Sequence, residues 1–172
     1  MKKEKLNVRE LTFASLLLSV AVVLSFIESS FPPLPFLPAG IKLGSSNIIV
    51  MYSLFFLGNK WGFSVAFLKS MFVLLLRGPV AFALSLSGAL LSCAVVITLR
   101  KSEDLSLVFV SIGGAVAHNI GQIFAASVIL KNFYLWYYLP ILLASGILMG
   151  SVTGVTSKII MPKLQFLRGH FK

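Results

Sequence analysis

The amino-acid sequence predicts an all-α integral membrane protein, a bundle of six transmembrane helices with both termini in the cytoplasm. Of the 172 residues, 58% are hydrophobic and 12% are charged, whereas soluble domains carry about 25% charged residues. The mean hydropathy is +0.96, and the apolar residues form runs on the scale of the roughly 30 Å hydrocarbon core. Lysine and arginine lie predominantly on one side of these runs. We therefore expect residues 1–172 to form a single transmembrane domain.

The expected membrane segments lie at about residues 11–30, 43–58, 61–77, 80–99, 105–130 and 139–160. The linker 31–42, FPPLPFLPAGIK, carries four prolines and one glycine, so it cannot form regular helix. Because the linker is apolar, we expect an ordered outer lid. The second segment would be only about 24 Å long, so we expect it to begin below the membrane surface. Asn59 and Lys60 form the turn before the third segment.

The later breaks are equally short. Gly78 and Pro79 end the third segment and begin the fourth, with proline at a position that a helix tolerates in its first turn. Residues 100–104 form a polar loop before the fifth segment. Residues 131–138, KNFYLWYY, are typical of the aromatic belt at a membrane interface. A basic tail is expected after the sixth segment.

The orientation follows from the cations. With the N-terminus inside, most lysines and arginines face the cytoplasm, as the positive-inside rule requires. The cytoplasmic set is Lys2, Lys3, Lys5, Arg9, Lys60, Arg100, Lys101, Lys158, Lys163, Arg168 and Lys172, and the outer set is Lys42, Arg77 and Lys131. Because these cations sit at helix ends, the net charge of +10 does not indicate nucleic acid, and we expect none as a partner.

Polar residues that are unusual for a membrane interior gather in the outer half of the predicted bundle. Lys69 lies near the middle of its helix, where a cation costs about 2.5–3.5 kcal/mol and marks a functional site by default. Arg77 follows on the same helix, about 80° away in azimuth and about 12 Å along the axis. We predict a substrate-binding pocket, open to the outside, lined by Glu28, Lys42, Asn47, Lys69, Arg77, His118, Asn119 and Gln122.

The excess of cations in this set favours an anionic solute, because charge-assisted hydrogen bonds are strong away from water. Each residue also has a structural explanation. Arg77 could lie at the interface, Lys69 could snorkel, Glu28 could neutralise Arg77 or Lys42, and Asn119 could join helices. The sequence leaves open whether Lys69 and Arg77 face the pocket or only pair with Glu28.

Nothing in the sequence indicates catalysis. The one aspartate, Asp104, lies in a predicted loop, so no aspartate-rich motif is available to bind magnesium diphosphate. No nucleotide-binding loop of the GxxxxGK[ST] form is present. His118, His170 and Cys93 do not make a metal-ligand set. We therefore expect no enzyme, no cofactor and no metal site, and we expect Cys93 to be a core residue.

Small residues recur at helical spacing in two places. Gly146, Gly150 and Gly154 form a ridge on the last segment, which permits close contact between helices. Ala14, Ser15 and Ser19 give the first segment a slim face. We interpret the glycine ridge as internal packing and keep both packing and partner docking open for the first segment.

Three stretches resemble a known family: LSFIESSFPPLPFLPAGIKLGSSNIIVMYSLFFLGNKW, LKSMFVLLLRGPVAFALSLSGALLS and HNIGQIFAAS. Together they are similar to the bacterial Gx transporter family, also known as heptaprenyl diphosphate synthase component I, over residues 8–160. That family is similar to the S-components of energy-coupling-factor (ECF) transporters. The resemblance implies a six-helix bundle that binds a small solute from outside and docks on a transmembrane T-component with ATPase subunits. It assigns the docking role to Ala14, Ser15 and Ser19, although Leu18 stands where S-components repeat alanine.

The favoured hypothesis is the substrate-binding subunit of an ECF-type importer in the plasma membrane of a bacterium. The alternative is a non-catalytic membrane subunit linked to isoprenoid or quinone synthesis, or to membrane electron transfer. A weaker third hypothesis is a membrane enzyme acting on a lipid phosphate. The identity of the solute and the oligomeric state stay open.

Overall fold

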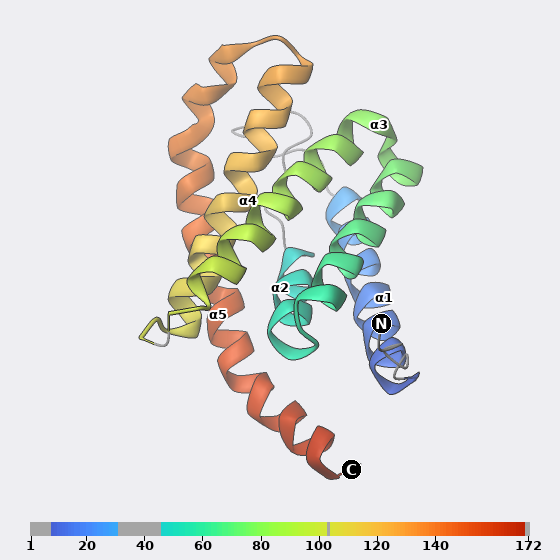
Figure 1. Ribbon diagram of the computed structural model, residues 1–172. Coiled ribbons are helices and arrows are strands. Elements are labelled where there is room, and N and C mark those ends of the chain that lie inside the picture. The colour runs from blue at the N-terminus through green and yellow to red at the C-terminus, as the bar shows by residue number, and fades with distance from the viewer. Residues whose placement is uncertain (1–7, 31–45, 103, 171–172) are drawn as a thin grey trace, which may run out of the picture.

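The computed structural model describes residues 8–30, 46–102 and 104–170, and these residues are almost entirely helical (Figure 1). The described residues contain no β-strand, which confirms the all-α fold class. The elements are α1 (Val8–Ser30), α2 (Asn47–Phe56), α3 (Asn59–Leu99), α4 (Leu107–Ile129), the 3-10 helix η1 (Phe133–Tyr138) and α5 (Leu139–His170).

The longest element, α3, joins two of the expected segments, 61–77 and 80–99. Its backbone leaves the helical region at Gly78, where φ is 84° and ψ is −179°, a combination open essentially to glycine alone. Pro79 follows in the first turn of the second arm. The two arms, 59–77 and 79–99, diverge from an apex at Gly78 (Figure 1). The predicted break is therefore confirmed, as a sharp bend inside one element.

Within the predicted aromatic belt 131–138, residues Phe133–Tyr138 form the 3-10 helix η1. The predicted membrane segment 139–160 lies within α5, whose backbone continues as helix to His170 through the predicted basic tail.

Four helices, α1, α3, α4 and α5, have segments long and apolar enough to cross a membrane, so the chain has the character of a multi-pass membrane protein. Each arm of α3 is about 30 Å long at 1.5 Å per residue. The ten-residue α2 is about 15 Å long and cannot cross alone. Six crossings and cytoplasmic termini remain predictions.

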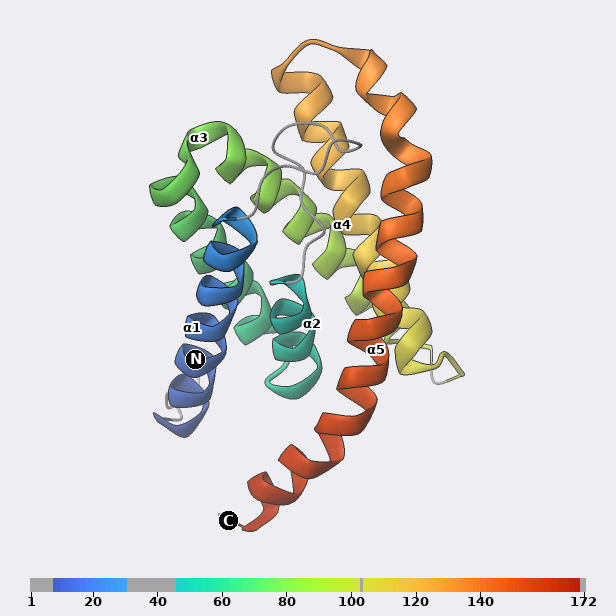
Figure 2. The ribbon, with the colours of Figure 1, turned by 180° about the vertical axis from the view of Figure 1, so that it is seen from behind.

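The helices pack around the short central α2. Figure 2 shows α2 between α1 and α5, and the beginning of α1 and the end of α5 lie at the same end of the molecule. At Gly150 an added Cβ atom would lie 2.5 Å from the Cα atom of Ile112, and at Gly154 it would lie 2.5 Å from the Cα atom of Val108. The glycine ridge therefore packs α5 against α4, as predicted for internal contact.

The buried apolar residues that the structure describes form three clusters. The first, which includes Leu54, Val65, Cys93 and Val96, lies toward the α2–α3 turn, and a smaller one includes Leu84 and Ile123 on the side of η1. The third joins α1 to α2 through Leu17, Tyr52 and Phe56. Cys93 is fully buried in the first cluster, as predicted.

Polar contacts fasten the end of the bundle where α2 meets α3. The Nη1 atom of Arg100 donates to the carbonyl oxygen of Leu54 at 2.6 Å, and the guanidinium lies 5.6 Å from the ring centroid of Phe55. The indole Nε1 of Trp61 donates to Oε2 of Glu10 at 3.0 Å. These contacts hold α1 and α2 against the ends of α3.

Candidate functional site

A small polar cavity lies between α1, α2, α3 and α4. Its volume is about 30 Å³, room for one or two water molecules, so a larger solute must displace its walls. Its polar lining comes from four helices or their starts and comprises Ser25, Glu28, Ser46, Asn47, Lys69, Arg77, Ser85, His118 and Gln122. The structure thus brings together six of the eight residues that the sequence singled out.

Lys69 is the most unusual member of this lining. It lies on the first arm of α3, and only 4% of its surface is exposed. Its Nζ atom donates a hydrogen bond to Oδ1 of Asn47 at the start of α2. Because the ammonium group is buried, Lys69 does not snorkel to a membrane interface. Its charge is instead held inside the bundle, beside the cavity.

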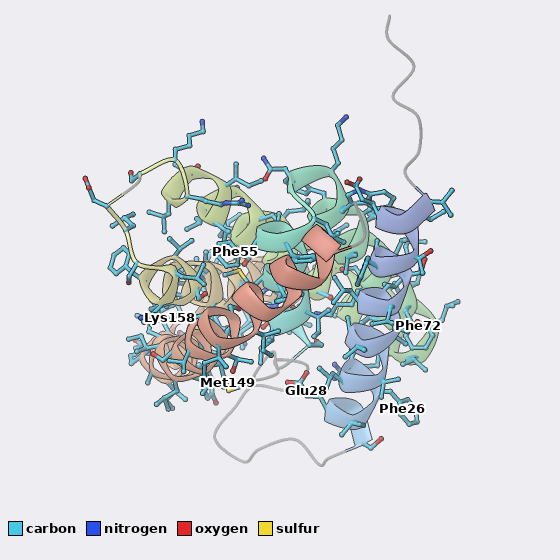
Figure 3. The ribbon with its side chains drawn as sticks, turned by 90° about the horizontal axis from the view of Figure 1, so that it is seen from below. Phe26, Glu28, Phe55, Phe72, Met149 and Lys158 are labelled. Atoms are coloured by element: carbon cyan, nitrogen blue, oxygen red, sulfur yellow. The ribbon has the colours of Figure 1, made fainter. Side chains whose placement is uncertain are left out.

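Glu28 and Arg77 add two further charges to the lining. Figure 3 shows Glu28 directed toward the middle of the bundle, whereas Phe26, two residues earlier on α1, points away from it. Arg77 is exposed and immediately precedes the bend of α3, so it stands at the rim of the cavity. Among the described residues, two cations and one carboxylate therefore surround the same small space.

The opposite wall is made by α4. His118 and Gln122 are 3% and 6% exposed and line the cavity together, as their shared helix face predicts. Among the described residues, no hydrogen bond of normal geometry reaches Nδ1 of His118 or Oε1 of Gln122. Such orphaned buried atoms are rare in folded proteins. Gly88 makes room for the imidazole, because an added Cβ atom there would lie 2.8 Å from it.

Asn119 points elsewhere. Its Nδ2 atom donates to the carbonyl oxygen of Leu142 at 2.7 Å and to Oγ of Ser145 at 3.2 Å, both on α5. These bonds match the structural alternative of a link between helices. Asn119 borders a second cavity of about 20 Å³, and Asn47 and His118 border both cavities.

The other predicted residues are Lys42 and the three docking residues of α1. Lys42 and the lid 31–42 lie outside the described residues. Ala14 is 5% exposed and packs in the core. Ser15 and Ser19 are exposed on α1, and each hydroxyl donates to a carbonyl oxygen of its own helix at 2.9 Å. A docking face on α1 stays a prediction; of its three predicted residues, Ser15 and Ser19 are exposed and Ala14 is buried.

Three serines of the lining were not predicted as site residues from the sequence: Ser25, Ser46 and Ser85. Ser25 precedes Glu28 by three residues, so helical spacing alone would have placed both on one face. Ser85 lies across the bend of α3 from Ser70, and their hydroxyl oxygens are 3.2 Å apart. Pairing residues across the Gly78 break would have found it. Ser46 had no such signal.

The arrangement is suited to binding. Lys69 and Arg77 offer positive charge, Gln122 and Asn47 offer amides, and His118 offers an imidazole nitrogen. Within the part of the chain that the structure describes, no three histidine, cysteine, aspartate or glutamate side chains gather as a metal site.

Comparison with known proteins places the chain in a family. No curated protein matches it significantly. The fold is similar to the solved S component of a bacterial ECF transporter, with a TM-score of 0.59 and 23% sequence identity, over 95% of this chain and 96% of that one. The sequence model of the family described as heptaprenyl diphosphate synthase component I matches residues 17–160. The chain therefore belongs to the heptaprenyl diphosphate synthase component I family and has the fold of an ECF transporter S component.

Proposed function

We propose that this chain is the substrate-binding subunit of an ECF-type importer in a bacterial plasma membrane, and that the cavity around Lys69 binds a small anionic solute. The observation that carries the proposal is the buried ammonium group of Lys69, which lines a polar cavity inside a bundle with the S-component fold. A buried cation in a membrane helix is costly. A bound acid would place a negative charge beside this ammonium group, in addition to its contacts within the protein.

The balance of charge supports an anion. Lys69 and Arg77 face the cavity against the single carboxylate of Glu28. An acid group bound there would gain charge-assisted hydrogen bonds in surroundings that exclude most water. A cationic solute would instead meet two positive charges, which would disfavour its binding.

The proposed importer needs partner subunits that supply energy for transport, because we assign no nucleotide hydrolysis to this chain. We propose a transmembrane T-component with two cytoplasmic ATPase subunits as partners. The exposed small residues Ser15 and Ser19 on α1 would let a partner helix approach closely.

The family description supports a second candidate, a non-catalytic membrane subunit linked to isoprenoid or quinone synthesis. Asp104 is the only aspartate in the chain, so a synthase reaction that depends on aspartate-bound magnesium would have to be carried by another protein. In this candidate the partner is a soluble prenyl synthase.

Affinity purification of the full chain in mild detergent separates the two candidates. The importer predicts co-purification of a T-component with ATPases, and the alternative predicts a prenyl synthase. Ser19→Phe should reduce capture of the T-component at least about tenfold, whereas Val20→Phe, at an exposed position about 100° around α1 from Ser19, should not. Recovery of a prenyl synthase without transport ATPases would reject the importer.

A further inference from the structure

Resting on the proposed function, we infer that the solute has two distinct ends. One end is a carboxylate or phosphate group that binds between the amino-terminal end of α2 and Lys69. The other end carries an N–H or O–H group that donates a hydrogen bond to Gln122. The solute is therefore an acid with a hydrogen-bonding group opposite the acid, and not a simple fatty acid or an inorganic anion.

The acid end is assigned to the start of α2. Ser46 and Asn47, at the beginning of this ten-residue helix, both line the cavity. Ser46 is 3% exposed, and its side chain makes no capping hydrogen bond to the first turn. The first N–H groups of a helix lack partners within the helix and carry partial positive charge. Lys69 adds a full positive charge beside the same helix end.

The second end is assigned from independent atoms on α4. Only 6% of the surface of Gln122 is exposed, and its Oε1 atom has no hydrogen-bond partner among the described residues. Nδ1 of His118, which is 3% exposed, makes no hydrogen bond of normal geometry and lies close to the Gly88 backbone, so the assignment depends on Gln122. A buried acceptor without a partner costs about as much as a lost hydrogen bond. A solute that donates to Gln122 removes this cost, and a purely apolar tail does not.

Asn47 links the two ends. Its Oδ1 atom accepts from Lys69, and its side chain also borders the second cavity, on the side of His118 and Asn119. An incoming acid takes the place of Asn47 as acceptor for Lys69. The released amide then turns toward the second cavity, and the separation between the two cavities opens.

Glu28 limits the number of acid groups. Its carboxylate lines the cavity together with Arg77, so a second acid group on the solute would meet a like charge. The acid end of the solute therefore carries one acid group, and the far end is neutral.

Three small probes test this class on the purified full chain in detergent. The probe 4-ureidobutanoate has an acid and N–H donors, hexanoate has the acid with an apolar tail, and 4-ureidobutanamide has the donors without the acid. Calorimetric titration should give 4-ureidobutanoate an affinity at least about tenfold higher than either of the others, because each lacks one charge-assisted or buried hydrogen bond.

Two variants assign each preference to its residue. Lys69→Met should abolish the preference for the acid over the amide, and Gln122→Leu should abolish only the preference for the ureido acid over hexanoate. Lys158→Met, at an exposed position on α5, should leave both preferences unchanged. If Lys69→Met does not fold, the ranking of the probes on the unaltered chain and on Gln122→Leu decides the question.

Equal affinity for the three probes, or a preference for hexanoate, would overturn the two-ended solute. So would full retention of both preferences in the variants. These results leave the importer itself standing, because that proposal fails separately, when purification yields no transport ATPases.

Discussion

Replacing Gly121 with alanine should destabilise the bundle, although alanine favours helix more than glycine does. An added Cβ atom at Gly121 would lie 2.8 Å from the Cα atom of Gly88 and 2.8 Å from the carbonyl oxygen of Ser87. Carbon atoms pack at about 3.5–4.0 Å, and both of these neighbours are backbone. The α3 and α4 helices would therefore have to separate by about 1 Å.

The size of the effect follows from two opposing terms. Forcing an extra methyl group into packed structure costs roughly 1–3 kcal/mol, and the gain in helix propensity returns about 0.5–1 kcal/mol. The Oγ atom of Ser87 also donates to the carbonyl oxygen of Gly121 at 2.9 Å, and separation would weaken that bond. We expect a net loss of about 1–2 kcal/mol, and weaker solute binding because His118 and Gln122 move with α4.

Gly113 is the matched control on the same helix. There the nearest atom to an added Cβ is Cδ1 of Leu99 at 2.7 Å, the movable end of a side chain. Gly113→Ala should therefore be neutral or stabilising, by up to about 1 kcal/mol. Unfolding of both variants in mixed detergent micelles measures the difference. Equal stability changes at Gly113 and Gly121 would refute the close approach of α3 and α4 on which the geometry of the site depends.

Three further changes test other parts of the account by the same unfolding assay. Gly78→Ala should destabilise by about 1–3 kcal/mol because its backbone conformation is open essentially to glycine; an unchanged midpoint would contradict the bend. Asn119→Leu should cost roughly 0.6–1.7 kcal/mol by removing its bond to Leu142 while solute affinity stays within twofold; a tenfold loss of affinity would instead make Asn119 a binding residue. Arg100→Ala should cost about 1–3 kcal/mol through the lost bond to the carbonyl of Leu54, and a stability equal to that of the unaltered chain would show that this contact is not formed.

The parts of the fold that the sequence predicted correctly depend on strong local signals. Gly78 followed by Pro79 predicts a bend, because glycine adopts backbone conformations closed to other residues and proline removes a backbone N–H donor. The ridge of glycines on α5 predicts close packing, because the absence of side chains lets a neighbouring helix approach. Neither signal needs knowledge of distant residues.

The part of the site that was predicted also depends on local signals. His118 and Gln122 lie one helical turn apart, so their shared face follows from the geometry of a single helix. That Lys69 meets Asn47 could not be predicted, because it depends on how the short α2 is placed between distant helices. Asn119 was assigned to the pocket, yet its bonds lie with α5, since residues next to each other in a helix face different directions.

The end of α5 shows a different limit. The predicted membrane segment ended at residue 160 because a basic tail follows it, but hydropathy reports where the membrane ends and not where the helix ends. A helix can continue beyond the bilayer, because its backbone hydrogen bonds are satisfied within the segment. The helix therefore runs on to His170.

The central claim is that a small acid binds in the cavity at Lys69. Native mass spectrometry of the full chain, released from detergent, measures this directly by the mass of any bound small molecule. The account predicts a bound acid on the unaltered chain and on Lys158→Met, and at least tenfold lower occupancy on Lys69→Met despite normal folding. A bound molecule that is cationic or purely apolar, or equal occupancy in all three proteins, would contradict it.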